Sequence, residues 1–194
     1  GQDDFGERLR ANLAAAGVDI THVGIDAGQG SGMSVAISED SGEYGAVVVS
    51  GANLSIDAAA IAPAWSSLWE AKVLLLQNEV PEAVSLAAAR AARSRGAQIV
   101  LNAAPARKMS AEFLSFVDVL VVNRVEAEML AVTGDMAAAL AALHSPTRDV
   151  VLTRGGDGLM LLTRDGKRTD IPALAVQLIS SHGAGDCFCG ALAA

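Results

Sequence analysis

The chain has 194 residues, with 14 Lys or Arg against 22 Asp or Glu, and a formal net charge of −8. This acidic balance argues against general nucleic-acid binding, which depends on clustered cations. Hydrophobic residues make up 52% of the chain, which is enough to build the core of one sizeable α/β domain. Every long apolar stretch is interrupted by a charge or a turn-forming residue, so we expect no membrane-spanning helix and no membrane partner.

The first 50 residues predict one helix followed by one pair of strands. Residues 3–16 carry an apolar side chain at every fourth position from Phe5, which is the spacing of an amphipathic helix, and Gly17 ends the pattern. Residues 31–49 hold two apolar runs separated by a short polar turn, which predicts a β-hairpin. Because no helical pattern accompanies this hairpin, we expect it to project from the core as a small second element.

From about residue 72 the pattern alternates between strands and helices. Continuous apolar runs predict buried strands at residues 73–76, 99–101, 117–122 and 150–153. Helical patterns lie at residues 81–94, from about 125 onward, at 135–143 and from Gly183 to the end. Two further strands, at 159–162 and 169–171, add antiparallel pieces. Buried strands that alternate with helices indicate a mostly parallel sheet covered by helices on both faces.

The glycine turn that opens the last helix is the most informative stretch of the chain. Gly183, Ala184 and Gly185 precede Asp186 there. Glycines let successive backbone N–H groups point to one side, and with a helix N-terminus they form a site for negative charge. A carboxylate beside a phosphate is useful there if it accepts the proton of a nucleophile, as in phosphoryl transfer. The alternative is an ordinary helix start, in which Asp186 interacts favourably with the helix dipole.

Six further segments occur in a fixed order along the chain: Gly1-Gln2-Asp3-Asp4-Phe5-Gly6, Gly51-Ala52-Asn53, Leu76-Gln77-Asn78-Glu79-Val80-Pro81, Leu101-Asn102-Ala103-Ala104-Pro105-Ala106, Asn123-Arg124-Val125-Glu126 and Thr153-Arg154-Gly155-Gly156-Asp157-Gly158. With the glycine turn, they resemble the ribokinase family, also called the phosphofructokinase-B family of carbohydrate kinases, over essentially the whole chain. The resemblance implies a ribokinase-like three-layer α/β sandwich with a mostly parallel central sheet and a small β-strand lid. Residues 1–30 and 50–194 would form the core that binds nucleotide and substrate, and residues 31–49 the lid hairpin.

The resemblance also implies a role for each matched residue. Asp186 would be the catalytic base, and the N–H groups of Gly183, Ala184, Gly185 and Asp186 would hold the transferring phosphoryl group. The nucleotide would be bound by Asn123, Thr153, Gly155 and Gly158. Glu126 would organise Mg²⁺, partly through water. Glu79 would contact the sugar together with Asp186, and the lid hairpin would cover the substrate and exclude water.

Local structure offers another explanation for several of these matches. Asn123 and Glu126 have the spacing of a helix capping box. The segment from Gly155 to Gly158 would serve equally well as a hairpin turn. Glu79 would also suit the start of a helix, where a carboxylate interacts favourably with the dipole. At the level of sequence these alternatives stay open.

Two departures from the family pattern affect the expected activity. Ser180-Ser181-His182 stands where the family usually has Asp-Thr-Thr. The missing Asp is a usual ligand of a monovalent cation, so activation by K⁺ is in doubt. The family pattern also normally begins before Gly1 and continues past Ala194, so we do not expect these 194 residues alone to form a competent kinase.

The leading hypothesis is an ATP-dependent carbohydrate kinase that uses ATP and Mg²⁺ to phosphorylate a hydroxyl of ribose or a similar pentose or ketohexose. A nucleoside kinase of the same fold is one alternative, although residues 31–49 offer only Tyr44 to stack a base. A sugar- or nucleotide-sensing binding protein that lost catalysis is another. The family analogy also suggests a homodimer formed through the lid. Cys187 and Cys189 match neither zinc-site spacing nor disulfide geometry, which suits a reducing, cytoplasmic compartment.

Overall fold

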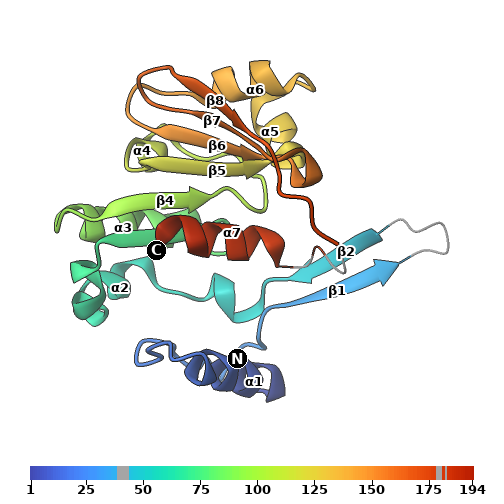
Figure 1. Ribbon diagram of the computed structural model, residues 1–194. Coiled ribbons are helices and arrows are strands. Elements are labelled where there is room, and N and C mark those ends of the chain that lie inside the picture. Colours follow the sequence, from blue (N-terminus) through green and yellow to red (C-terminus); the bar gives the residue numbers. More distant parts are fainter. Residues whose placement is uncertain (39–43, 178–180, 182) are drawn as a thin grey trace.

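The computed structural model describes residues 1–38, 44–177, 181 and 183–194, and its centre is a six-stranded sheet (Figure 1). The strands follow one another in sequence order: β3 (Val73–Gln77), β4 (Gln98–Asn102), β5 (Val119–Asn123), β6 (Asp149–Thr153), β7 (Leu159–Leu162) and β8 (Arg168–Ile171). The pairings from β3 to β6 are parallel, and β7 and β8 join as antiparallel strands. The predicted mostly parallel α/β sheet is therefore confirmed.

Alternate residues of each strand pack against opposite helical layers, because side chains on a strand point to opposite faces in turn. Ile99 and Leu101 of β4 belong to the larger core, whereas Val100 between them belongs to a smaller one on the other face. The larger core is covered by α2 (Ala58–Ala64), α3 (Glu82–Arg93), α4 (Ala111–Ser115), α5 (Arg124–Ala131) and α6 (Met136–Leu143). The smaller core is covered by α7 (Ala184–Ala193), which contributes Cys189 and Phe188. The sheet thus lies between two helical layers.

The N-terminal part of the chain stands apart from the sheet (Figure 1). Helix α1 (Asp4–Ala15) has Asp3 as its N-cap, and the Asp3 side chain accepts a hydrogen bond from the N–H of Gly6. It ends before Gly17, which has a positive φ of 76°. The hairpin of β1 (Met33–Ser38) and β2 (Tyr44–Val49) forms its own two-stranded antiparallel sheet, as predicted. Short 3₁₀ turns complete the fold: η1 (Gly51–Leu54), η2 (Ser66–Glu70) and η3 (Gly155–Asp157).

One helix boundary differs by a residue from the sequence prediction. Pro81 was expected inside the first turn of α3, but it is the N-cap, with φ −55° and ψ 140°. Its carbonyl accepts hydrogen bonds from the N–H groups of Val84 and Ser85, so the helix starts at Glu82. Across the described residues, none of the helices is both long enough and apolar enough to cross a membrane.

Candidate active site

The glycine turn leads into α7 through a left-handed backbone conformation. Gly183 is the N-cap residue, with φ 71° and ψ 3°, a region that favours glycine. The N–H of Ala184 donates to the carbonyl of Ser181 at 3.2 Å, and no side-chain hydrogen bond caps this helix among the residues described. The first N–H groups of a helix have no partner within the helix. Within the described part of the chain, the N–H groups of Gly185 and Asp186 have no hydrogen-bond acceptor, and they lie where an anion could bind.

Asp186 lies at the edge of a cavity of about 150 Å³ at the carboxyl ends of the central strands. The Asp186 side chain is exposed to solvent and is not buried in the hydrophobic core. It contributes to the lining of this cavity. The same cavity is lined by several of the other predicted residues, namely Asn123, Glu126, Thr153, Gly183 and Gly185. Phe188 and Cys189 of α7 add an apolar side to it. The fold thus brings together residues that are more than 60 positions apart in the sequence.

Asn123 and Glu126 form the capping box that their spacing predicts. The N–H of Glu126 donates to Asn123 Oδ1 at 2.9 Å, and the N–H of Asn123 donates to Glu126 Oε2 at 2.8 Å. Asn123 Nδ2 also donates to Glu126 Oε1 at 2.9 Å. Burial raises the pKa of the Glu126 carboxyl, while these hydrogen bonds from Asn123 act in the opposite direction. Both oxygens of this buried carboxylate thus accept hydrogen bonds from Asn123, and the residue lines the cavity.

The loop after β6 forms a tight turn from Gly155 to Gly158, as its glycines predict. Gly158 has φ 80°, and its N–H donates to the carbonyl of Gly155, which has φ 59°. Thr153, at the end of β6, donates from Oγ1 to the carbonyl of Val122 at 3.4 Å and lines the 150 Å³ cavity. Gly155, Gly158 and Ala184 do not line this cavity, nor the larger one beside α1. Of the four residues predicted to bind the nucleotide, Asn123 and Thr153 face this cavity.

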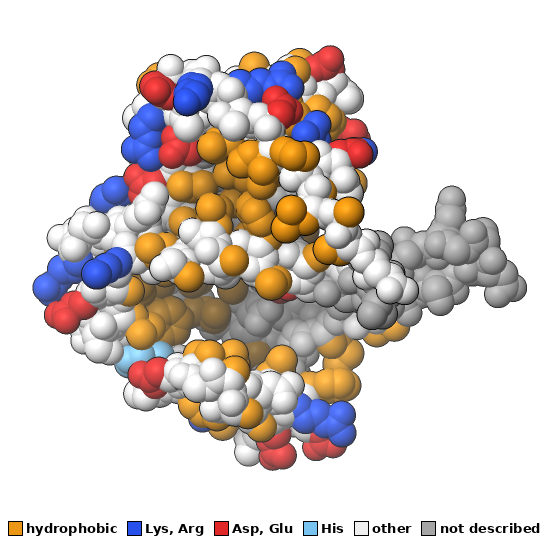
Figure 2. Space-filling view, viewed as in Figure 1, with side chains coloured by type: hydrophobic (Ala, Val, Ile, Leu, Met, Phe, Trp, Pro, Cys, Tyr) orange, Lys and Arg blue, Asp and Glu red, His pale blue; other side chains and the backbone are white. Residues whose placement is uncertain are grey.

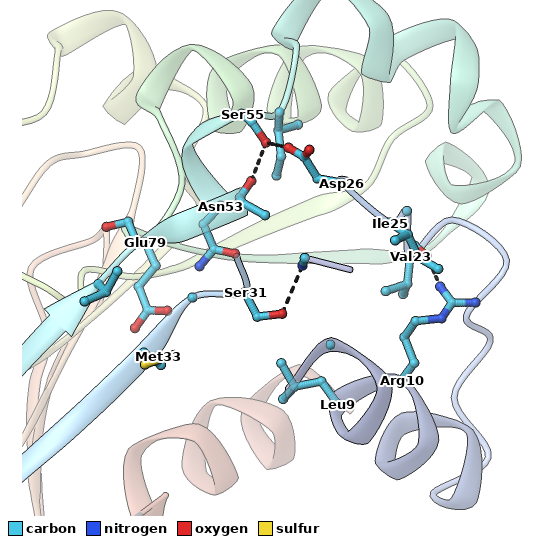
Figure 3. A pocket seen from close by; sticks show the side chains of 18 of the residues that line it. Leu9, Arg10, Val23, Ile25, Asp26, Ser31, Met33, Asn53, Ser55 and Glu79 are labelled. Carbon is cyan, nitrogen blue, oxygen red and sulfur yellow. Dashed lines mark hydrogen bonds between the residues drawn. The ribbon is translucent and has the colours of Figure 1, made fainter. Parts of the chain in front are cut away.

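Glu79 faces a second, larger cavity of about 930 Å³ between α1, the hairpin and the end of β3 (Figure 2). Its side chain is exposed, and its N–H donates to Gln77 Oε1 at 2.6 Å. In Figure 3 the Glu79 carboxylate lies near Met33 of β1, and Asn53 extends from η1 toward the same space. The predicted sugar contact and the predicted base therefore line different cavities. The apolar and polar groups around Glu79 would suit a small polyhydroxylated molecule.

Comparison with known proteins places the chain in a family. The model of the pfkB family carbohydrate kinases matches residues 1–194. This chain belongs to that family. Ribokinase from Haemophilus influenzae is 32% identical over 196 residues, which is 98% of this chain and 64% of that protein. Deoxyribokinase from Salmonella typhi is 28% identical over 202 residues, which is 100% of this chain and 65% of that protein.

The fold of this pfkB family chain is also found in solved structures. The crystal structure of ribokinase from Thermotoga maritima superposes with a TM-score of 0.81 at 25% identity, covering 100% of this chain and 64% of that one. The family membership and the ribokinase-like fold expected from the ordered motifs are therefore confirmed. The chain spans slightly less than two thirds of the length of these relatives.

The pfkB family implies Mg²⁺, and the cavity around Asp186 offers ligands of the right kind. Glu126 and Asp186 are two carboxylates that line the same small cavity. No group of three or more His, Cys, Asp or Glu that could hold a metal by itself occurs among the described residues. Mg²⁺ is usually bound by one or two carboxylates together with waters and substrate phosphates. The two carboxylates therefore fit a Mg²⁺ that arrives with a polyphosphate and is held partly through water.

The departure that affects K⁺ lies mostly outside the described residues. Ser180 and His182 are not among them, and Ser181 contributes its carbonyl to the turn before α7.

Sequence reasoning missed two polar groups around the larger cavity. Asp3 accepts hydrogen bonds from the Ser31 N–H at 2.6 Å, from Ser31 Oγ at 2.7 Å and from the Gly6 N–H. These bonds tie the start of α1 to Ser31, which lines the cavity just before the hairpin. Asp26 likewise accepts from Ser55 Oγ and from the Gly28 N–H, which lowers the pKa of its carboxyl. The Gly-x-Asp match at residues 1–3 was the only signal for Asp3.

Asp3 should make the stability of the protein depend on acidic pH. Hydrogen bonds from Ser31, followed by that from Gly6, lower the pKa of the Asp3 carboxyl from 3.8 to about 2. A carboxyl with a lowered pKa stabilises the fold above its unfolded-state pKa and loses that contribution as the pH falls through its folded-state pKa. We expect Asp3→Asn to lower the free energy of unfolding near pH 6, and the deficit to shrink between about pH 4 and pH 2.

Urea unfolding at a series of pH values checks this expectation. Ser31→Ala removes one of the three donors, so it should weaken the same pH dependence without abolishing it. A deficit for Asp3→Asn that is as large at pH 2.5 as at pH 6 would contradict the assignment.

Proposed function

We propose that the protein is an ATP-dependent kinase that phosphorylates a hydroxyl group of ribose or a closely related pentose or ketohexose. The observation that carries this proposal is an exposed carboxylate, Asp186, at a glycine turn that opens a helix, beside the Asn123–Glu126 pair in one cavity. A carboxylate and anion-binding N–H groups at one point are what phosphoryl transfer to a hydroxyl requires. Membership of the pfkB family supports the same reading.

In the proposed reaction, Asp186 accepts the proton of the sugar hydroxyl as that oxygen attacks the γ-phosphorus of ATP. A new phosphorus–oxygen bond forms to the sugar, and the bond to the leaving oxygen of ADP breaks. The backbone N–H groups of Gly185 and Asp186 donate hydrogen bonds to the phosphoryl oxygens, where negative charge must be stabilised. Bound Mg²⁺ would neutralise part of the phosphate charge, with Glu126 and Asn123 as the residues that hold it through water.

The larger cavity is the proposed sugar site, with Glu79 as a hydrogen-bond acceptor for sugar hydroxyls, and the hydroxyl that is phosphorylated would have to reach from there to Asp186 in the smaller cavity. Its volume of about 930 Å³ is larger than a pentose needs, so the hairpin would have to close over the sugar to exclude water. Met33, Val48 and Val49 of the hairpin already line that cavity. The named relatives, a ribokinase and a deoxyribokinase, support a pentose as substrate.

We also propose that the hairpin pairs with that of a second copy of the chain. Val35 and Val47 pair across the hairpin, are exposed, and line neither of the two cavities. An apolar face of this kind is best covered by an identical one in a two-fold dimer.

An ADP-release assay on the full-length protein tests the proposed function. It supplies MgATP with ribose, 2-deoxyribose, fructose or adenosine, and follows ADP with a coupled enzyme system. We expect the highest kcat/KM with ribose or with another free pentose or ketohexose. Calorimetry with the same compounds runs beside it, because binding and turnover can differ.

Two results would overturn the proposal. Turnover with adenosine but with none of the free sugars would make the protein a nucleoside kinase. Heat of binding for ATP and a sugar without any release of ADP would instead make it a sensing protein.

A further inference from the structure

The carboxyl ends of β5 and β6 carry a cation that the mechanism above does not use. These strands pair with Asn123 opposite Thr153, and both residues line the smaller cavity. Arg124 is the first residue of α5 and follows Asn123 directly. Its Nη2 donates to the carbonyl of Arg154 at 3.4 Å and to the carboxylate of Asp157. The Arg124 side chain therefore bridges the start of α5 and the loop after β6, the two segments that the family resemblance assigns to the nucleotide.

The smaller cavity has no positive side chain of its own among the residues described. Its lining contains the carboxylates of Glu126 and Asp186, and no Lys or Arg. A nucleotide polyphosphate would therefore meet two like charges there, which is unfavourable unless cations offset them. An arginine offers forked N–H donors that match phosphate oxygens. Arg124 does not itself line the cavity, but it directly follows the lining Asn123 and is the nearest arginine in sequence to that residue.

The position of Arg124 is not explained by helix stability. A positive side chain in the first turn of a helix is unfavourable, because the helix dipole is positive at that end. The Asp157 carboxylate offsets this, but the pair is exposed, with 48% of the Arg124 side chain and 67% of the Asp157 side chain accessible. Exposed ion pairs contribute little to stability and exchange easily. Asp157 can thus be displaced by a stronger anion without disturbing the fold.

We propose that Arg124 binds the phosphates of the nucleotide, and that the Asp157 carboxylate holds its guanidinium in position until a phosphate replaces it. The inference rests on the proposed function, since it takes a nucleotide as the ligand of this cleft. Arg124 is the binding residue, and Asp157 is a positioning residue that competes with the ligand. The guanidinium of the nearby Arg154 lies instead toward β8, where it pairs with Asp170 at 3.5 Å.

Calorimetric titration of the full-length protein with ADP and with adenosine tests the proposal. Arg124→Gln should weaken ADP binding about 10-fold, because charge-assisted hydrogen bonds to phosphate are lost. Adenosine lacks phosphates, so its affinity should not change. Asp157→Asn removes the competing carboxylate and should tighten ADP binding about 2- to 5-fold. Arg124→Lys keeps the charge without the forked donors and should recover part of the loss.

The matched control is Arg90→Gln. Arg90 pairs with Glu112 at similar exposure, 54% and 58%, but joins α3 to α4 away from the cavity. It should bind ADP like the unchanged protein. Equal weakening of ADP and adenosine by Arg124→Gln, or weaker ADP binding in Asp157→Asn, would mean that the ion pair only shapes the loop, and would overturn the inference. Unchanged ADP binding in Arg124→Gln would overturn it as well and leave the proposed function standing, whereas failure of the unchanged protein to bind ADP would overturn both.

Discussion

Asp186→Asn should lower kcat by about 10²- to 10⁴-fold, the range expected when a general base is removed. Asparagine has nearly the same shape as aspartate but cannot accept the proton of the sugar hydroxyl. Asp186 is exposed at the first turn of α7, so the substitution should leave the fold intact. The Kd of MgATP should change little, because the residues proposed to hold Mg²⁺ through water, Glu126 and Asn123, are unchanged. The measurements are steady-state ADP release and calorimetry on the full-length protein.

The control for this substitution is Asp4→Asn. Asp4 is also an exposed aspartate in the first turn of a helix, in this case α1. It lines neither of the two cavities, so its replacement should leave kcat within about 2-fold of the unchanged value. If Asp186→Asn turns over as fast as Asp4→Asn, Asp186 is a helix-start carboxylate and not the base.

The parts of the fold that could be predicted from sequence are those encoded by neighbouring residues. The strands β4, β5 and β6 are continuous apolar runs, and helical patterns precede β4 and separate β5 from β6, so a parallel sheet follows from local periodicity. The five-residue helix α4 between β4 and β5 was not predicted, because it is too short to show a period. The capping box of Asn123 and Glu126 is visible because its two residues lie three apart. The matching order of the motifs then made the family identifiable.

The parts that could not be predicted depend on contacts between distant segments. Asp3 and Ser31 are 28 residues apart, and Arg124 and Asp157 are 33 apart. Each pair consists of ordinary polar residues in loops or at helix starts, whose periodicity carries no information about partners. The separation of Glu79 from Asp186 into two cavities is of the same kind, because it depends on how α1 and the hairpin stand relative to the sheet. The order of the motifs along the chain identifies these residues, but it does not predict which of them line the same cavity.

Gly158→Ala should destabilise the protein by about 3 kcal/mol or more, since a strained backbone and a steric clash combine. Gly158 has φ 80°, and a Cβ built on it would lie 2.0 Å from the carbonyl oxygen of Ile171 and 2.7 Å from the N of Ala173. Both are backbone atoms, so no side-chain rotation can relieve the contact. Either the end of β8 or the loop after β6 must move. Movement of the loop would also displace Arg154, whose N–H donates to the Gly158 carbonyl at 2.7 Å and whose own carbonyl accepts a hydrogen bond from Arg124. Since Arg124 is the proposed phosphate-binding residue, we also expect weaker ADP binding.

The two other glycines of this loop separate the causes. Gly155 has φ 59° but open space around a built Cβ, so Gly155→Ala should cost about 1 kcal/mol from backbone strain alone. Gly156 has neither a positive φ nor any atom within 4 Å of a built Cβ, so Gly156→Ala should change stability by less than about 0.5 kcal/mol. Urea unfolding of the three variants should rank the losses as 158, then 155, then 156. A Gly156→Ala loss as large as that of Gly158→Ala would show that the loop needs glycine for flexibility, and that the close approach to β8 is not what holds the turn.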